Sequence, residues 1–301
     1  MRDPFREGLA AGWKHVDASQ LAVDLPIEAD VVIVGSGAGG GVSAELLTAA
    51  GLKVVIVEEG PLRTSSDFNM REAEAYPDLY QESAARKTAD KAINILQGRC
   101  VGGSTTVNWT SSFRTPPRTL QWWQSAWGLK RLGVDAMAPW FAAMEQRLHV
   151  GLWPIPPNEN NAALARGATQ LGIPVAVIPR NVKMCWNIGY CGMGCPTNAK
   201  QSMLVTTLPA ALTNGATLIS RLRAERFEFS GNKAVSLTAL AMKPDGIHPN
   251  GVKVTLRARH FVLAGGAINS PALLLRSKAA DPHGLLGKRT FLHPTLISSG
   301  L

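Results

Sequence analysis

A glycine-rich turn between two short apolar segments constrains the fold of this chain more than any other feature. The almost uniformly apolar run Asp30–Val34 leads into Gly35-Ser-Gly-Ala-Gly-Gly-Gly41, and a second run, Lys53–Val57, ends at Glu58. Runs of this kind are typical of strands buried on both faces of a parallel sheet. Between them, apolar residues recur at helical spacing at Val42, Leu46, Leu47 and Ala50. The segment therefore predicts a βαβ unit, which occupies about thirty residues.

The glycines of this turn have separate physical roles in binding a dinucleotide. Gly35 permits the tight turn out of the strand, Gly37 lets the backbone approach a pyrophosphate, and Gly40 lets the helix lie close to the strand. The helix N-terminus adds free amide groups and a partial positive charge. Glu58 lies 23 positions after Gly35, close to the roughly 20 expected for a ribose-binding carboxylate. Glu59 competes for that role.

Two later segments narrow the choice of dinucleotide. Gly98-Arg-Cys-Val-Gly-Gly-Ser-Thr-Thr-Val-Asn108 is a second glycine-rich loop. Its backbone amides and small hydroxyls suit a flavin, whose ring system must be held along its edge, whereas an NAD enzyme has no obvious need of it. The third segment, Ala264–Pro271, again pairs a buried strand with a glycine turn and a helix start. There Ser270 and Pro271 are expected as N-cap and first residue of the helix.

Taken together, these three segments resemble the glucose-methanol-choline (GMC) flavoprotein oxidoreductases. The likeness extends from about residue 28 to the C-terminus, and the motifs occur in the family's order. The resemblance implies FAD as cofactor. It also implies oxidation of the CH–OH group of a primary alcohol or sugar by hydride transfer to flavin N5.

The resemblance also assigns cofactor contacts position by position. They fall at Gly35, Gly37, Gly40, Glu58, Arg99, Gly103, Ser104 and Asn108. The first three would contact the pyrophosphate, the carboxylate would contact the adenosine ribose, and the last four would line the flavin. Val107 stands where some members carry a histidine joined covalently to FAD, so non-covalent FAD is expected. Lys278 replaces the glycine that usually closes the family's second signature, which leaves the end of that helix open.

Three cysteines lie close together in the sequence, at Cys185, Cys191 and Cys195. Their spacing is similar to that of a cysteine segment that holds an iron–sulfur cluster in the flavin subunits of bacterial sugar dehydrogenases. Cys191–Cys195, followed by Ala199–Ser202, also resembles the long-chain alcohol oxidase branch. A fourth local ligand is lacking, which disfavours zinc. An iron–sulfur site and structural thiols both stay open, and Cys100 is expected to be a packing residue.

The predicted fold is α/β. It is a three-layer, Rossmann-like FAD-binding domain with a mostly parallel sheet, a β-meander over 216–263 and an irregular cap region. The expected divisions are an N-terminal arm (1–28), the two parts of the FAD-binding domain (29–118 and 201–286), the cap with the cysteines (119–200) and the start of a truncated substrate-binding domain (287–301). Family members are considerably longer than this chain, so the catalytic residues stay unassigned. His283 and His293 are expected to be structural or surface histidines.

The function predicted from these features is that of the N-terminal portion of an FAD-dependent alcohol or sugar oxidoreductase, either dehydrogenase or oxidase. One alternative is an FAD-binding fragment without turnover, and a weaker one is a nicotinamide-dependent dehydrogenase. The expected partners are a small-molecule alcohol or sugar and an electron acceptor, either another subunit or a quinone. The formal charge of +9 is scattered along the chain, which disfavours nucleic acid. The longest apolar stretches are interrupted and no secretory core is seen, so a cytoplasmic location, with peripheral membrane attachment left open, is expected.

Overall fold

A computed structural model describes residues 2–292 of the chain. Within these residues the chain divides into two compact units. The first comprises residues 2–107, 190–198 and 203–292, and the second comprises residues 108–189 and 199–202.

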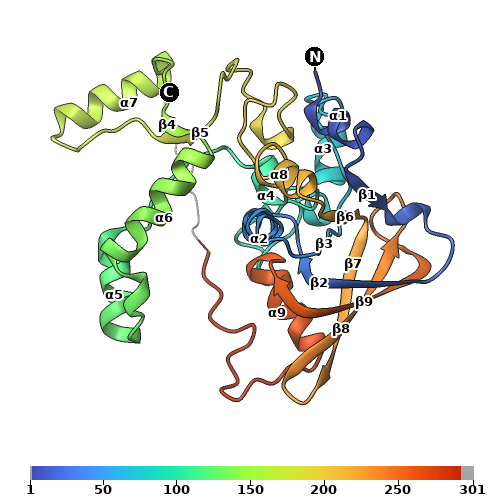
Figure 1. Cartoon of the computed structure of the whole chain (residues 1–301). Coiled ribbons are helices and arrows are strands. Elements are labelled where there is room, and N and C mark those ends of the chain that lie inside the picture. The colour runs from blue at the N-terminus through green and yellow to red at the C-terminus, as the bar shows by residue number, and fades with distance from the viewer. Residues whose placement is uncertain (1, 293–301) are drawn as a thin grey trace. The chain divides into compact units, whose positions relative to one another are not determined.

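The first unit is built on one mixed sheet (Figure 1). Within the described residues it has seven strands in the order β1-β6-β3-β2-β9-β8-β7. Their bounds are β1 (Lys14–Asp17), β2 (Leu25–Val34), β3 (Val54–Val57), β6 (Thr217–Ser220), β7 (Leu222–Ser230), β8 (Lys233–Met242) and β9 (Pro249–Leu263). The first five strands in this order, β1, β6, β3, β2 and β9, pair in parallel. Strand β8 pairs antiparallel with both β9 and β7. The α/β fold with a mostly parallel sheet is confirmed.

The predicted meander is confirmed for β7 to β9 but is wrong at its start. Strand β6 pairs in parallel with β1 and β3. Only Arg221 separates β6 from β7, too little chain for the turn that an antiparallel hairpin needs. Strand β6 also follows a helix, as expected where a strand enters a sheet parallel to its neighbours.

The central strands β2 and β3 contribute fully buried residues to the core of this unit, which also includes residues of β6, β7, β8 and β9. Residues 31–34 and 54–57 are buried throughout, and Val32 pairs with Val55 on one side and Phe261 on the other. Each fully buried aliphatic side chain contributes about 1.5–3 kcal/mol relative to exposure. The two apolar runs in the sequence therefore account for the position of the core.

The helices of the first unit are α1 (Pro4–Ala10), α2 (Ala38–Ala49), α3 (Glu72–Leu79), α4 (Ser104–Val107), α8 (Thr207–Thr213) and α9 (Gly266–Arg276), with 3₁₀ turns η1 (Ala18–Gln20), η2 (Gln81–Ala84) and η4 (Cys191–Met193). Helix α2 packs on β2, β3 and α8, and α9 packs on β7. In the part of the chain described, no helix is long and apolar enough to cross a membrane.

Helix α9 begins earlier than predicted. Ser270 and Pro271 were expected to start it, but Pro271 lies inside the helix. The reason is Gly266, whose φ of +83° turns the chain directly from β9 into the helix. The expectation at Ser270 is therefore wrong.

The second unit contains helices α5 (Pro117–Trp127), α6 (Val134–Arg147) and α7 (Glu159–Gln170), the 3₁₀ turn η3 (Lys130–Leu132) and strands β4 (Val150–Leu152) and β5 (Pro179–Asn181). The two strands pair antiparallel. Helix α5 ends at Gly128, whose left-handed φ of +65° suits glycine. Helices α6 and α7 bury no residue fully, and Trp140 is 66% exposed. This unit therefore has little core of its own.

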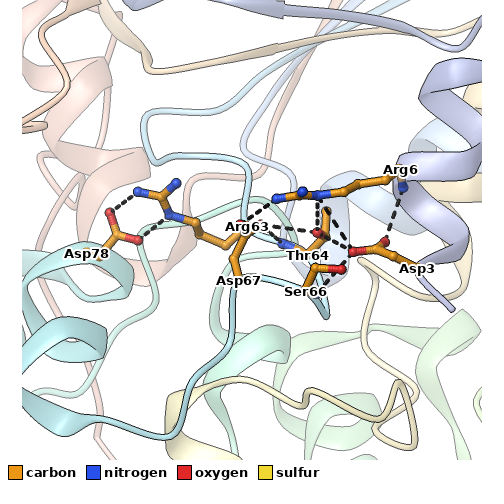
Figure 2. A network of polar contacts seen from close by, with 7 residues as sticks. All are labelled: Asp3, Arg6, Arg63, Thr64, Ser66, Asp67 and Asp78. Atoms are coloured by element: carbon orange, nitrogen blue, oxygen red, sulfur yellow. Dashed lines mark hydrogen bonds and ion pairs between the residues drawn. The ribbon is translucent and has the colours of Figure 1, made fainter. Parts of the chain in front are cut away.

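A polar network fixes the N-terminal helix to the loop after β3 (Figure 2). One carboxylate oxygen of Asp3 caps α1 by accepting the Arg6 amide (3.1 Å). The other accepts the Thr64 hydroxyl (2.6 Å) and the Ser66 amide (3.1 Å). The Arg6 guanidinium reaches Asp67 at 2.6 Å. Burial by itself would raise the pKa of Asp3, but these hydrogen bonds outweigh it and lower the pKa to about 2.

We expect Asp3→Asn to keep the cap of α1 and to release the helix from the loop, because one amide oxygen cannot replace both carboxylate oxygens. The loss should be about 1–3 kcal/mol at neutral pH. In the wild type this stabilisation is complete above the unfolded-state pKa of about 3.9 and falls as the pH drops towards about 2. Hydrogen exchange of α1 between pH 2 and 7 measures it.

Glu7→Gln is the matched control, because Glu7 lies in the same helix and its carboxylate forms an ion pair with the exposed Arg2. It should leave the protection of α1 almost unchanged. Equal losses in the two variants would show that the Asp3 network does not hold the helix.

Candidate functional site

A cavity of about 640 Å³ lies in the first unit at the carboxyl ends of three strands. Val34, Val57 and Leu263, the last residues of β2, β3 and β9, all contribute to its wall. In open α/β sheets, ligands bind at this edge. The volume falls in the range of about 300–1,000 Å³ that is usual for cofactor sites.

The first glycine turn forms one wall of the cavity. Gly35 has a φ of +96°, and Gly37 is the N-cap of α2. No side chain caps this helix, so its first amides are available to an anion. Gly40 does not line the cavity. A Cβ there would overlap the Gly35 carbonyl, so Gly40 serves the close packing of helix and strand.

The second glycine loop closes against the first. Gly98, Gly103 and Ser104 line the cavity, and the Gly98 amide donates to the Ser104 hydroxyl at 2.9 Å. A Cβ on Gly103 would lie 2.8 Å from the Gly37 Cα. The contact between the two loops therefore requires backbone without side chains, which leaves room for a flat or extended ligand. This arrangement fits the FAD that the sequence predicts.

Two of the residues predicted to contact the flavin, Arg99 and Asn108, are not part of this cavity wall. The Arg99 side chain is buried outside the cavity, where its guanidinium donates to the carbonyls of Gly246 and Pro77. Asn108 belongs to the second unit. Of the residues expected along the flavin, the cavity wall thus contains Gly103 and Ser104.

Glu58 lines the cavity at the end of β3 and is held by an internal network. One of its oxygens accepts the amide (3.0 Å) and hydroxyl (2.5 Å) of Ser36, and the other accepts the Gly60 amide (3.0 Å). Burial raises the pKa of Glu58, and these hydrogen bonds oppose the rise. The neighbouring Glu59 also lines the cavity. Both carboxylates therefore remain candidates for a ribose contact.

Three arginines in the cavity wall were not identified from the sequence: Arg86, Arg223 and Arg276. Arg86 is the best fixed, because it donates to the side-chain oxygens of Gln97 (2.7 Å) and Asn269 (3.2 Å). Positive groups beside a helix N-terminus favour an anionic ligand. Arg86 follows no motif, and its partner Asn269 is 183 residues away, so only the folded chain reveals it.

A left-handed turn lies beside this cavity wall. The consecutive residues Glu82, Ser83 and Ala84 have φ of 52°, 54° and 64°. Non-glycine residues persist in this region only where their surroundings fix them, at a cost of about 1–3 kcal/mol each. Arg86 supplies such a fixing contact by donating to the Glu82 carboxylate at 2.8 Å. The same side chain therefore holds the turn and lines the cavity.

The three clustered cysteines do not form a metal site in the described residues. Cys191 and Cys195 lie in the first unit and Cys185 in the second. Within residues 2–292, no group of three or more His, Cys, Asp or Glu side chains is arranged to hold a metal ion. The iron–sulfur prediction gains no support from these side chains. Cys100 is buried, as expected of a packing residue.

Of the two late histidines, His283 can be placed, and it contributes nothing to the cavity. His283 is exposed, and it is absent from the wall of the cavity. His293 lies outside the described residues.

Comparison with known proteins places the chain in a family context. Residues 76–295 match a family model described as GMC oxidoreductase. The long-chain-alcohol oxidase FAO4B of Arabidopsis thaliana is 33% identical over 91% of this chain and 37% of its own length. The uncharacterized GMC-type oxidoreductase y4nJ of Sinorhizobium fredii (strain NBRC 101917 / NGR234) is 32% identical over 93% of this chain and 55% of its own length. The chain thus spans between 37% and 55% of these relatives.

The fold has a similar counterpart among solved structures. Pyridoxine 4-oxidase from "Mesorbium loti" superimposes with a TM-score of 0.64 at 23% identity, over 85% of this chain and 53% of that chain. This likeness concerns the fold.

We expect Gly37→Ala to weaken FAD binding while leaving the fold intact. The nearest protein atom to the new Cβ would be the Gly103 Cα, at 3.8 Å. The Cβ would, however, occupy space where the pyrophosphate of FAD is expected to lie. The affinity for FAD should fall at least about tenfold, equivalent to about 1.4 kcal/mol. Titration of the cofactor-free protein with FAD, together with thermal unfolding, measures both effects.

Gly40→Ala is the opposite case, because its Cβ would overlap the Gly35 carbonyl. The main effect of this variant should be a loss of thermal stability, so any loss of FAD affinity in it would follow from the damaged fold. If Gly37→Ala bound FAD as tightly as the wild type, the glycine wall would not be the cofactor's contact surface.

Proposed function

The chain belongs to the GMC oxidoreductase family, and from this premise we propose that it supplies the FAD-binding part of an enzyme that oxidises the CH–OH group of an alcohol or sugar. The observation that carries the proposal is the glycine-walled cavity at the carboxyl ends of β2 and β3, into which α2 directs its N-terminus. Such a site suits a ligand with a pyrophosphate and two flat ring systems.

Different residues of the chain would bind different parts of FAD. The uncapped amides of α2 beside Gly37 would accept the pyrophosphate, and Glu58 or Glu59 would accept ribose hydroxyls. Gly103 and Ser104 would hold the ring system along its edge. Bound FAD supplies the acceptor for the substrate's hydride, at flavin N5. With Val107 at the position of the family's covalent histidine, binding would be non-covalent.

The substrate class is supported by the relatives. The Arabidopsis relative is named a long-chain-alcohol oxidase, so a long-chain primary alcohol is the first substrate to test, followed by a sugar. Because the chain spans about half or less of its curated relatives, turnover, electron acceptor and substrate belong to the proposal. The acceptor would be oxygen, a quinone or an electron-carrying subunit.

A second candidate is an FAD-binding fragment that does not turn over. The observation in its favour is that no histidine lines the cavity among residues 2–292. In this case the chain would bind the cofactor and present it to chemistry supplied by residues outside those described.

Absorption spectroscopy of the purified chain reconstituted with FAD separates these proposals. We expect flavin bands that survive gel filtration. Under anaerobic conditions, addition of a long-chain primary alcohol or a sugar should bleach them, because hydride from the CH–OH carbon reduces the flavin. Gly37→Ala is the control for cofactor occupancy.

Each outcome has a distinct meaning. A protein that retains FAD without bleaching with either substrate class would favour the fragment without turnover. A protein that retains no FAD but binds NAD would overturn the flavin proposal. Broad absorption beyond the flavin bands that disappears with dithionite would revive the iron–sulfur site at Cys185, Cys191 and Cys195.

A further inference from the structure

We propose that Arg99 is a positioning residue that sets cofactor affinity from outside the cavity, by anchoring the second glycine loop to the turn between β8 and β9. The inference rests on the proposed function, since its effect is on FAD. It assigns a role to the turn at residues 243–248, which contributes nothing to the cavity wall.

The hydrogen bonds of the Arg99 side chain are made to backbone carbonyls outside the cavity. Its guanidinium donates to the Gly246 carbonyl and, at 3.3 Å, to the Pro77 carbonyl. Its Nε is buried without a hydrogen-bond partner. Burying a charged group with one donor unsatisfied is costly, so the remaining charge-assisted hydrogen bonds are needed to hold it there.

The main chain of Arg99 is confined at the same time. Its amide donates to the Leu79 carbonyl at 2.7 Å. On the other side, a Cβ on Gly60 would overlap the Arg99 carbonyl, so the two segments are in backbone contact. Gly98, the residue before Arg99, lines the cavity and donates to Ser104 in the same wall. A shift of Arg99 would therefore move the wall itself.

The turn that contains Gly246 is held by hydrogen bonds of its own. The Asp245 carboxylate accepts the amides of Ile247 (2.7 Å) and His248 (3.0 Å) and faces the His248 Nδ1 at 3.0 Å. The Gly246 amide donates to the Lys243 carbonyl at 2.9 Å. The Gly246 carbonyl is thus presented to Arg99 from a fixed position.

A side chain at position 246 would require the Arg99 guanidinium to move. A Cβ there would lie 2.7 Å from the Arg99 Nη1, and the residue has a φ of +67°. Gly231, in the turn between β7 and β8, has a similar φ of +58° and nothing within 4 Å of its ideal Cβ. Alanine at either glycine incurs the same kind of backbone strain, but only at Gly246 does it push on Arg99.

This pair of glycines gives the experiment its control. We expect Gly246→Ala to weaken FAD binding about tenfold and to speed its release, while Gly231→Ala binds FAD as the wild type does. Both variants should lose thermal stability to backbone strain, and Gly246→Ala should lose more, because its Cβ also pushes on Arg99. Hydrogen exchange of the cofactor-free proteins should show faster exchange at residues 98–104 in Gly246→Ala alone.

Substitution of Arg99 tests the anchor from the other side. Arg99→Met should weaken FAD binding as Gly246→Ala does, and Arg99→Lys should recover part of the loss, because one ammonium can still reach the Gly246 carbonyl. In the double variant Arg99→Met/Gly246→Ala the effects should not add, since both act through one contact. Gly246→Ala keeps the test available if Arg99→Met does not fold.

The outcomes separate this inference from the proposed function. Equal FAD affinity and equal exchange at residues 98–104 in Gly246→Ala and Gly231→Ala, in a chain that binds FAD, would overturn the anchor alone. A wild-type chain that takes up no FAD would overturn the proposed function and, with it, the cofactor role of Arg99. Additive losses in the double variant would show that the turn and Arg99 act separately.

Discussion

A buried carboxylate at the end of β3 joins the two glycine loops on which the candidate site depends. Glu58 accepts hydrogen bonds from the amide and hydroxyl of Ser36, and the Ser36 hydroxyl oxygen in turn accepts the Gly102 amide at 3.0 Å. Glycine segments have many accessible backbone conformations and no side chains to pack. Hydrogen bonds to the Glu58 carboxyl group supply the missing restraint, so the shape of the cavity depends on this network.

The same network limits what Glu58 can do for a ligand. Burial favours its neutral form, whereas the donors at Ser36 and Gly60 favour the carboxylate. A group held by three donors is a well-oriented acceptor, but part of its capacity is already used. The Glu59 carboxylate accepts a longer hydrogen bond, from the Gln81 amide at 3.5 Å, and is less constrained in the same wall. A structural role for Glu58 and a ribose contact at Glu59 are therefore compatible, and the sequence interval alone does not choose between them.

Much of the fold was predictable because its signals are local. The strand, glycine turn, helix and strand up to Glu58 follow one another directly, and each has a characteristic spacing of apolar residues. The position of β6 was not predictable, because its parallel partners β1 and β3 are some 160–200 residues away by register. The prediction of where α9 starts was wrong for a different reason. Ser270-Pro271 is a typical local signal for a helix start, but the backbone conformation available to Gly266 lets the helix begin earlier.

The residues of the candidate site show the same contrast between local signals and distant contacts. Gly37 and Gly103 line the cavity, and the sequence could single them out because the role predicted for them is one of backbone geometry, which a motif specifies. Arg99 is predicted to contact the flavin, and the structure adds that its side chain donates to the Gly246 carbonyl, 147 residues away. The sequence could not indicate this contact, because the direction of a long side chain depends on its distant acceptor. Arg86 was not identified from the sequence because its place in the cavity wall depends on distant partners such as Asn269. A motif thus locates the wall of such a cavity, while the charges behind and within it are set by tertiary contacts, and those contacts determine how firmly the wall is held.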